Sequence, residues 1–267
     1  MAGGIRLGVQ SRLVPGASLR ERHATARRFG FDGIELSGPD MIAMAEEAVR
    51  EEVPVSAICG GHRGWPIDPD PVRVRESRED IDRLLELGAR LDAPLILVPI
   101  YGRNRKFPGM HTGRSPEADE ELWLEGLRLA TDRAVAVGGS ILVEPINRYE
   151  NSVTVTVADA MRWVASMGSD RVRPMIDVFH ANIEEASMAD SIASVGQALG
   201  YVHLGDSQRL EPGRGHLAWD EVFGALHGIG YRGWATMECN LSGPAERVLP
   251  EAAAFLRQRI EAAGQAT

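Results

Sequence analysis

The stretch ILVEPINRYEN, residues 141–151, runs from three apolar residues straight into a glutamate. Residues 141–143 are expected to form a buried strand because they are apolar and are followed by a proline-containing turn. Glu144 ends this strand, and a second glutamate, Glu150, follows in the same segment. A single carboxylate after a strand is most often a turn former or a helix cap. Its meaning therefore depends on how the other strands end.

The sequence on both sides of this stretch alternates short apolar runs with longer amphipathic runs. This pattern is typical of strand–helix units and a parallel sheet. The expected strands are residues 5–10, 33–36, 55–58, 94–98, 141–143, 172–176, 201–204 and 234–237. The expected helices are residues 18–30, which open with a capping box from Ser18 to Glu21, and residues 41–52, 74–91, 116–137, 157–167, 190–198, 219–227 and 246–263.

Eight strand–helix units in 267 residues predict one α/β domain over residues 1–267, folded as a (β/α)8 TIM barrel. No G-x-G-x-x-G motif follows the first expected strand, which argues against a dinucleotide-binding doubly wound sheet. In such a barrel the functional residues lie at the carboxyl ends of the strands. These ends are therefore where we expect the site.

The composition argues against several classes of protein. The net charge of −9 disfavours nucleic acid as a partner because an acidic chain repels phosphates. No apolar run is long enough to span a membrane, and the segment MAGGIRLGVQ lacks the apolar region of a signal peptide. Cys59 and Cys239 form neither a CxxC motif nor a disulfide framework. A reducing cytoplasm is therefore the expected location.

Acidic and imidazole side chains occur at the ends of the last four expected strands. Glu144 follows the fifth strand, Asp177 ends the sixth in RPMID, and Glu238 ends the eighth in WATME. His203 lies near the end of the seventh strand, in YVHLGD. A lone histidine in an apolar strand is usually a core residue, but four such residues on successive strands predict one shared site.

Three carboxylates at one buried point would repel each other unless their pKa values rise or a cation lies among them. A divalent metal is the simpler solution, with an imidazole completing its ligands. Carboxylate-rich ligation with one histidine suits Mn²⁺ best, with Co²⁺ and Mg²⁺ as alternatives. The sequence therefore predicts a divalent-metal site.

The order and spacing of these four residues resemble those of the ketose 3-epimerases. This family includes the tagatose and psicose epimerases and belongs to the xylose isomerase-like superfamily of sugar isomerases and epimerases. The resemblance extends over nearly the whole chain and is most specific in three segments, which are VEPINRYEN, MIDVFHANIEE and HLGDSQRLEPGRGHLAWDEVF. It implies an enzyme that binds a small carbohydrate and assembles as a dimer or tetramer.

The resemblance also implies roles for individual residues. The four side chains named above would bind the metal, and Glu144 and Glu238 would also form the acid/base pair. His180 and Arg209 would hold substrate oxygens near the carbonyl, and Glu150 would support the site through hydrogen bonds. The implied reaction is 3-epimerisation of a free keto sugar through a metal-stabilised enediolate, with a base on one face and an acid on the other.

Other activities need similar residues. An aldose–ketose isomerase, an inosose isomerase, and a dehydratase or lyase of the same superfamily could all use this set. A DNA-repair nuclease of the endonuclease IV type would need further histidines on earlier strands and a basic surface. The fourth strand ends in VPIYGR, without a histidine. A non-catalytic sugar-binding protein would not need an intact acid/base pair.

Three further residues could contact the substrate. His62 follows the glycines after Cys59, although a histidine in a surface loop is the commoner interpretation. Trp65 could form an apolar wall beside a sugar or could simply fill its loop. His216 could belong to a lid, but the segment GRGH that contains it fits a turn before the next helix better.

Overall fold

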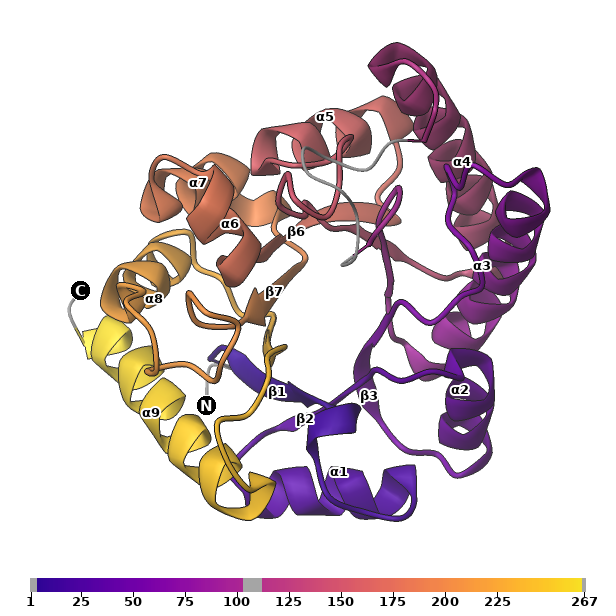
Figure 1. Cartoon of the computed structure of the whole chain (residues 1–267). Helices are drawn as coiled ribbons and strands as arrows, with labels where there is room; N and C mark the ends of the chain where they lie inside the picture. The colour runs from indigo at the N-terminus through magenta and orange to yellow at the C-terminus, as the bar shows by residue number, and fades with distance from the viewer. Residues whose placement is uncertain (1–3, 103–111, 266–267) are drawn as a thin grey trace.

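The computed structural model describes residues 4–102 and 112–265 and contains a closed barrel of parallel strands (Figure 1). Each strand pairs with the next one along the chain, and the eighth closes the ring against the first. The predicted (β/α)8 TIM barrel is therefore confirmed. Of the predicted domain, residues 1–3, 103–111 and 266–267 lie outside the described residues. The strands are β1 Arg6–Gln10, β2 Gly33–Leu36, β3 Val55–Cys59, β4 Leu95–Leu97, β5 Ile141–Val143, β6 Val172–Asp177, β7 Tyr201–Leu204 and β8 Trp234–Met237.

Helices form a ring around the outside of the barrel (Figure 1). Within residues 4–102 and 112–265, no helix has both the length and the apolar composition needed to cross a membrane. The α-helices are α1 Leu19–Arg28, α2 Met41–Arg50, α3 Pro71–Leu91, α4 Pro116–Val137, α5 Val157–Met167, α6 Val178–Glu184, α7 Met188–Val195, α8 Trp219–Gly228 and α9 Ala245–Gln265. Two short 3-10 helices, η1 Ser11–Leu13 and η2 Gly196–Ala198, complete the set.

Two helices differ from the sequence prediction in ways that matter for the site. The helix α3 begins earlier than predicted because the Asp70 side chain caps it at Val72 N and Pro71 suits a first helical turn. The helix α6 was not predicted at all, since seven residues are too few to show a helical period. It follows β6 directly and therefore lies at the carboxyl end of the barrel.

Smaller differences occur at two other helices. At α1, Ser18 caps the helix by accepting from Glu21 N, but the Glu21 carboxylate accepts from Ala17 N. The predicted capping box is thus only half formed. The predicted helix over residues 190–198 is α7 followed by η2.

Alternate residues of each strand face opposite sides of the barrel wall. In β7, Val202 and Leu204 belong to the large core between strands and helices, whereas Tyr201 belongs to a smaller cluster inside the barrel. His203 therefore also faces the interior. This inner cluster consists of Ala57, Ile96, Leu142, Met175 and Tyr201.

The same alternation directs the residues at the strand ends. Val143 and Met237 belong to the outer core. Glu144 and Glu238, which follow them, therefore turn toward the barrel axis. The apolar residues that hold the helices against the strands thus also determine which side chains reach the carboxyl mouth of the barrel.

Candidate active site

Four side chains from the last four strands meet at the carboxyl end of the barrel. Glu144 follows β5, Asp177 ends β6, His203 lies in β7 and Glu238 follows β8. One ligand atom from each lies within 4.8 Å of the others. Glu238 is partly buried and the other three are buried. The structure thus brings together the four residues that the sequence places at one site.

His203 lies at the centre of this group. Its Nδ1 atom is 2.9 Å from Glu238 Oε2, 3.2 Å from Glu144 Oε1 and 3.9 Å from Asp177 Oδ2. On the other side of the ring, Nε2 is 2.8 Å from Oε2 of Glu35 in β2. Burial alone would lower the pKa of His203, but the charges of Glu35 and Glu238 outweigh it and raise that pKa well above its usual value. A protonated imidazole therefore offsets part of the negative charge.

Arg209, in the loop after β7, offsets more of the negative charge of the carboxylates. Its Nη1 atom is 2.6 Å from Asp177 Oδ2, and its Nη2 atom is 2.8 Å from Glu238 Oε2. The residue has a φ of 60°, a left-handed conformation that costs free energy for a residue other than glycine. Two backbone hydrogen bonds hold it there, from Arg209 N to Asp206 O and from Asn240 N to Arg209 O. The loop geometry therefore aims the guanidinium at the carboxylates.

Asp177 and His180 are both positioned by the short helix α6. Asp177 caps this helix because its Oδ1 atom accepts from Phe179 N, which leaves Oδ2 facing the site. His180 Nδ1 lies 2.7 Å from Asn147 Nδ2 and accepts from Asn147 N. Burial lowers the pKa of His180. The neutral ring then carries its proton on Nε2, which lies 3.7 Å from Asp177 Oδ2.

The two glutamates of the group differ in acidity. Burial raises the pKa of the Glu144 carboxyl to about 7, although the hydrogen bond with His203 opposes this. Burial would also raise the pKa of Glu238, but the charges of Arg209 and His203 outweigh it and hold that pKa well below its usual range. Unequal carboxyl pairs of this kind are typical of acid/base sites.

A cavity of about 380 Å³ borders this group. Glu144, Glu238, His180 and Arg209 all line it, whereas Asp177 and His203 do not appear on its surface. Charged groups of the second half of the barrel therefore face a space large enough for a small molecule.

The opposite part of the cavity wall comes from the first half of the barrel. His62, Trp65 and Tyr101 line it, and their rings are in edge contact, with centroids 5.0 Å apart for His62–Trp65 and 6.1 Å apart for Trp65–Tyr101. His62 Nδ1 lies 3.0 Å from Gly64 O, and burial lowers the His62 pKa. Both residues suggested as substrate contacts in this loop thus reach the cavity.

Two other predicted residues lie elsewhere. Glu150 lies in the turn after β5, and its buried Oε2 atom has no hydrogen-bond partner among the described residues. Its charge acts on His180, where it opposes the effect of burial on the pKa. His216 is exposed, does not line the cavity, and donates its backbone N–H to Ser207 Oγ. The structure therefore does not bring His216 to the site.

Sequence reasoning missed several polar residues around the site. Glu35 contacts His203, Gln10 contacts Glu35, and Asn147 contacts His180. Arg12 lines the cavity and contacts Gln10. A usable signal existed for Glu35, because a glutamate inside the apolar strand GIEL must face the barrel interior.

The donor set of the four side chains fits a divalent cation. Three carboxylates and one imidazole suit Mn²⁺, Co²⁺ or Mg²⁺, and their donor atoms are close enough to share one ion. Arg209 and a protonated His203 balance the carboxylates in this structure. A bound cation would provide the same balance and would favour the ionised carboxylates.

Known proteins share this fold and much of this sequence. Residues 24–259 match the family described as xylose isomerase-like TIM barrel. The chain is 30% identical over 240 residues to the 3-dehydro-D-guloside 4-epimerase of Escherichia coli strain K12, which covers 88% of this chain and 92% of that protein. It is 47% identical over 221 residues to the D-psicose 3-epimerase of Enterocloster bolteae, with coverage of 78% and 72%.

A solved structure of a sugar epimerase also matches this fold. The 3-keto-D-glucoside 4-epimerase from E. coli superposes with a TM-score of 0.86 at 29% identity, covering 95% of this chain and 99% of that one. These relatives are all sugar epimerases. The chain therefore belongs to the xylose isomerase-like TIM barrel family.

Proposed function

We propose that this protein is a divalent-metal-dependent sugar epimerase that inverts a carbon next to a ketone. The observation that carries the proposal is the pair Glu144 and Glu238, which line one cavity and both contact His203. They come from different strands, so the two carboxylates can approach the reacting carbon from different sides. A proton can thus leave one face of the carbon and return to the opposite face.

The remaining residues stabilise the charge that develops on the substrate. Glu144, Asp177, His203 and Glu238 would hold the cation, which supplies Lewis-acid stabilisation of a negatively charged oxygen when bound. His180 Nε2–H and the Arg209 guanidinium would donate to substrate oxygens in the same cavity.

Mn²⁺ is the proposed cation, with Co²⁺ and Mg²⁺ as alternatives. Glu150 does not line the cavity and would support the site indirectly, through its charge near His180. Assembly as a dimer or tetramer and a cytoplasmic location stay predictions from the sequence.

A free keto sugar is the first proposed substrate, with the ketone at C2 and inversion at C3. The 47% identity to a D-psicose 3-epimerase supports this choice. A 3-keto sugar inverted at C4 is the second candidate, because the 3-dehydro-D-guloside 4-epimerase matches 92% of its length to this chain. Both reactions exchange the proton on a carbon next to a ketone, so the same acid/base pair serves either one.

Exchange in D₂O separates these reactions. The protein, loaded with Mn²⁺, is incubated with D-psicose, D-fructose, D-tagatose, an inosose and a 3-keto glucoside, and the products are followed by NMR. We expect deuterium at C3 of a ketose or at C4 of the 3-keto sugar, together with the epimer. Exchange at C1 alone would indicate an aldose–ketose isomerase, and a dehydrated product would indicate a lyase. No exchange with any of these compounds would contradict the proposal.

A further inference from the structure

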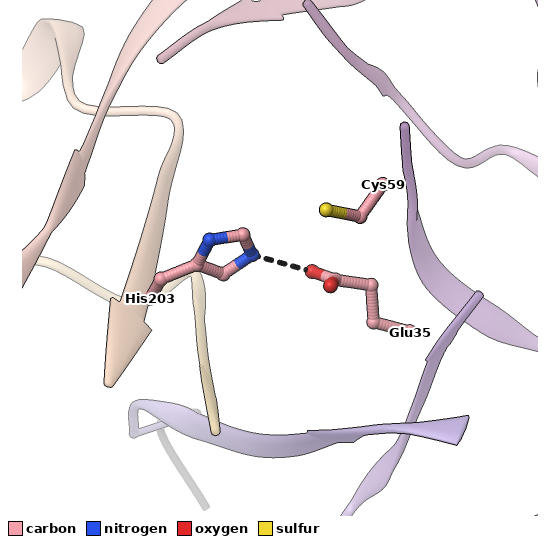
Figure 2. A group of neighbouring side chains, drawn as sticks. All are labelled: Glu35, Cys59 and His203. Carbon is pink, nitrogen blue, oxygen red and sulfur yellow. Dashed lines mark hydrogen bonds and ion pairs between the residues drawn. The ribbon is translucent and has the colours of Figure 1, made fainter. Parts of the chain in front are cut away.

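A second group of side chains meets at His203, where Glu35 faces one nitrogen of the ring (Figure 2). This nitrogen is Nε2, whereas Nδ1 faces the three carboxylates. Glu35 from β2 and His203 from β7 are both fully buried, and Glu35 Oε2 lies 2.8 Å from His203 Nε2. Cys59, at the end of β3, lies beside them. Nothing in the proposed chemistry uses Glu35 directly, so its burial needs another explanation.

A chain of hydrogen bonds fixes the donor from which each oxygen of Glu35 accepts. Arg12 Nε lies 2.7 Å from Gln10 Oε1, and arginine can only donate, so the Gln10 amide presents its oxygen to Arg12. The NH₂ group of Gln10 therefore faces Glu35 and donates to Oε1 over 2.8 Å. This leaves Glu35 Oε2 to accept from His203. The Arg12 end is anchored by a bond from Nη2 to Cys239 O.

We propose that Glu35 is a positioning residue that holds the proton of His203 on Nε2 and so presents the Nδ1 lone pair to the cation. The inference rests on the proposed cation site. A carboxylate that accepts from the far nitrogen of a metal-binding histidine fixes its tautomer and ring orientation. Here the acceptor, Glu35, comes from the opposite half of the barrel. It is the third member of the hydrogen-bonded series Arg12–Gln10–Glu35–His203.

A second cation bound by Glu35, Cys59 and His203 is the competing explanation. These three residues have donor atoms within 4.8 Å of one another. Both oxygens of Glu35 are already hydrogen-bonded, and burial raises the pKa of the Cys59 thiol well above its usual value. A neutral imidazole also has only one lone pair, which the first site would use. The group therefore orients a ligand and does not form a site of its own.

The test is Mn²⁺ binding to metal-stripped protein, measured by electron paramagnetic resonance of the free ion. In Glu35→Gln, the introduced amide can point its oxygen toward His203 and still accept from it. Its NH₂ group then faces the NH₂ group of Gln10, and neither can accept. Turning the amide the other way forces the His203 proton onto Nδ1. We expect binding roughly 10–100-fold weaker than in the wild type.

The double variant Gln10→Glu/Glu35→Gln restores a consistent chain with the same net charge. The carboxylate introduced at position 10 would accept from Arg12 and from the amide introduced at position 35, whose oxygen would accept from His203 Nε2. We expect the affinity of this variant for Mn²⁺ to return to within about threefold of the wild type, where a tenfold change equals about 1.4 kcal/mol. This double variant keeps each donor opposite an acceptor from Arg12 to His203. It therefore tests the inference even if Glu35→Gln fails to fold.

Tyr201→Phe is the matched control. Its buried hydroxyl bonds Ser56 and Thr236, and its ring lies 5.6 Å from the His203 ring, with no hydrogen bond to Glu35 among the described residues. We expect lower stability but unchanged Mn²⁺ affinity. Wild-type affinity for Mn²⁺ in Glu35→Gln would overturn this inference but not the proposed cation site. A folded double variant that still binds Mn²⁺ about 10-fold more weakly than the wild type would do the same.

Stoichiometry tests the competing explanation. We expect one Mn²⁺ per chain in the wild type and in Cys59→Ala. Two ions in the wild type and one in Cys59→Ala would assign this group to a second cation and overturn the inference. A wild type that binds no Mn²⁺ would remove the proposed cation site itself, which is a different result from equal binding in the wild type and Glu35→Gln.

Discussion

The two halves of the barrel contribute different chemistry to the same cavity. Strands β5 to β8 deliver the four clustered side chains, and the loop after β7 adds Arg209. The first half lines the cavity mostly with neutral groups, among them Trp65, Tyr101 and a His62 whose pKa burial lowers. Its charged contributions among the described residues are Arg12, which lines the cavity, and Glu35, which contacts Nε2 of His203.

Under the proposed function, this difference would separate catalysis from recognition. Charges that act on the reacting carbon must be held within tenths of an ångström, and strands provide that rigidity. The neutral wall, which consists of His62, Trp65 and Tyr101, comes from longer segments after β3 and β4, which can vary without disturbing the strands. We therefore expect variants in the second half to change the rate of reaction and variants in the first half to change substrate affinity.

The largest expected effect comes from removing either of the two proposed acid/base carboxylates. Glu144→Gln and Glu238→Gln keep the shape of the side chain but can neither take nor return a proton. We expect kcat to fall about 10²–10⁴-fold in each, measured by NMR with the substrate identified in D₂O. Glu211→Gln removes a buried carboxylate on the loop after β7 that bonds Ser242 and does not line the cavity, and it should keep most of the activity. Normal turnover in either active-site variant would reassign the pair.

The second effect concerns the cation. A metal ion present at about 100 times its Kd should stabilise the folded state by about 2.7 kcal/mol, which raises the Tm of a protein of this size by roughly 5–10 °C. We expect this shift on adding Mn²⁺ to the metal-stripped wild type and to Trp65→Ala, and little shift in Asp177→Asn. Thermal melts followed by circular dichroism measure it. Equal shifts in wild type and Asp177→Asn would argue against the site.

The same division explains what the sequence could predict. The strands, and the four residues at the ends of the last four, follow from apolar runs and their alternation, which are local properties. Glu35 and Asn147 were missed because their importance comes from contacts across the barrel, with His203 and His180. The helix α6 carries His180 but is too short to show a period. The segment that contains His216 was expected to fit a turn better than a lid, and His216 is exposed and does not line the cavity.

A smaller effect is expected from the neutral wall. Trp65 packs its ring against His62 and Tyr101 and faces the cavity, where it can cover an apolar face of a sugar. Trp65→Ala should raise KM about 10-fold, a loss of about 1.4 kcal/mol, and leave kcat within about threefold. Steady-state kinetics at saturating Mn²⁺ provide the measurement. A fall in kcat at constant KM would place Trp65 in the chemistry and break the division between the halves.

The smallest effect concerns the anchor of that wall. Asp80 of α3 accepts from Arg63 N and Arg63 Nη2, each over 2.8 Å, and so holds the loop that carries His62 and Trp65. Burial would raise the pKa of Asp80, but the hydrogen bonds and charge of Arg63 outweigh it and lower that pKa.

Because the folded state lowers this pKa, Asp80 stabilises the fold above the pKa it has in the unfolded chain, and the stabilisation is lost as the pH falls through the folded value. Asp80→Asn should therefore lower the Tm by a few degrees at about pH 7. The difference from the wild type should shrink below about pH 4. Asp82→Asn on the same helix is the control, and thermal melts across this range measure both variants. A Tm difference that stays constant with pH would mean that the Asp80 charge does not hold the loop. An unchanged KM in Asp80→Asn would mean that the position of the neutral wall does not depend on Asp80.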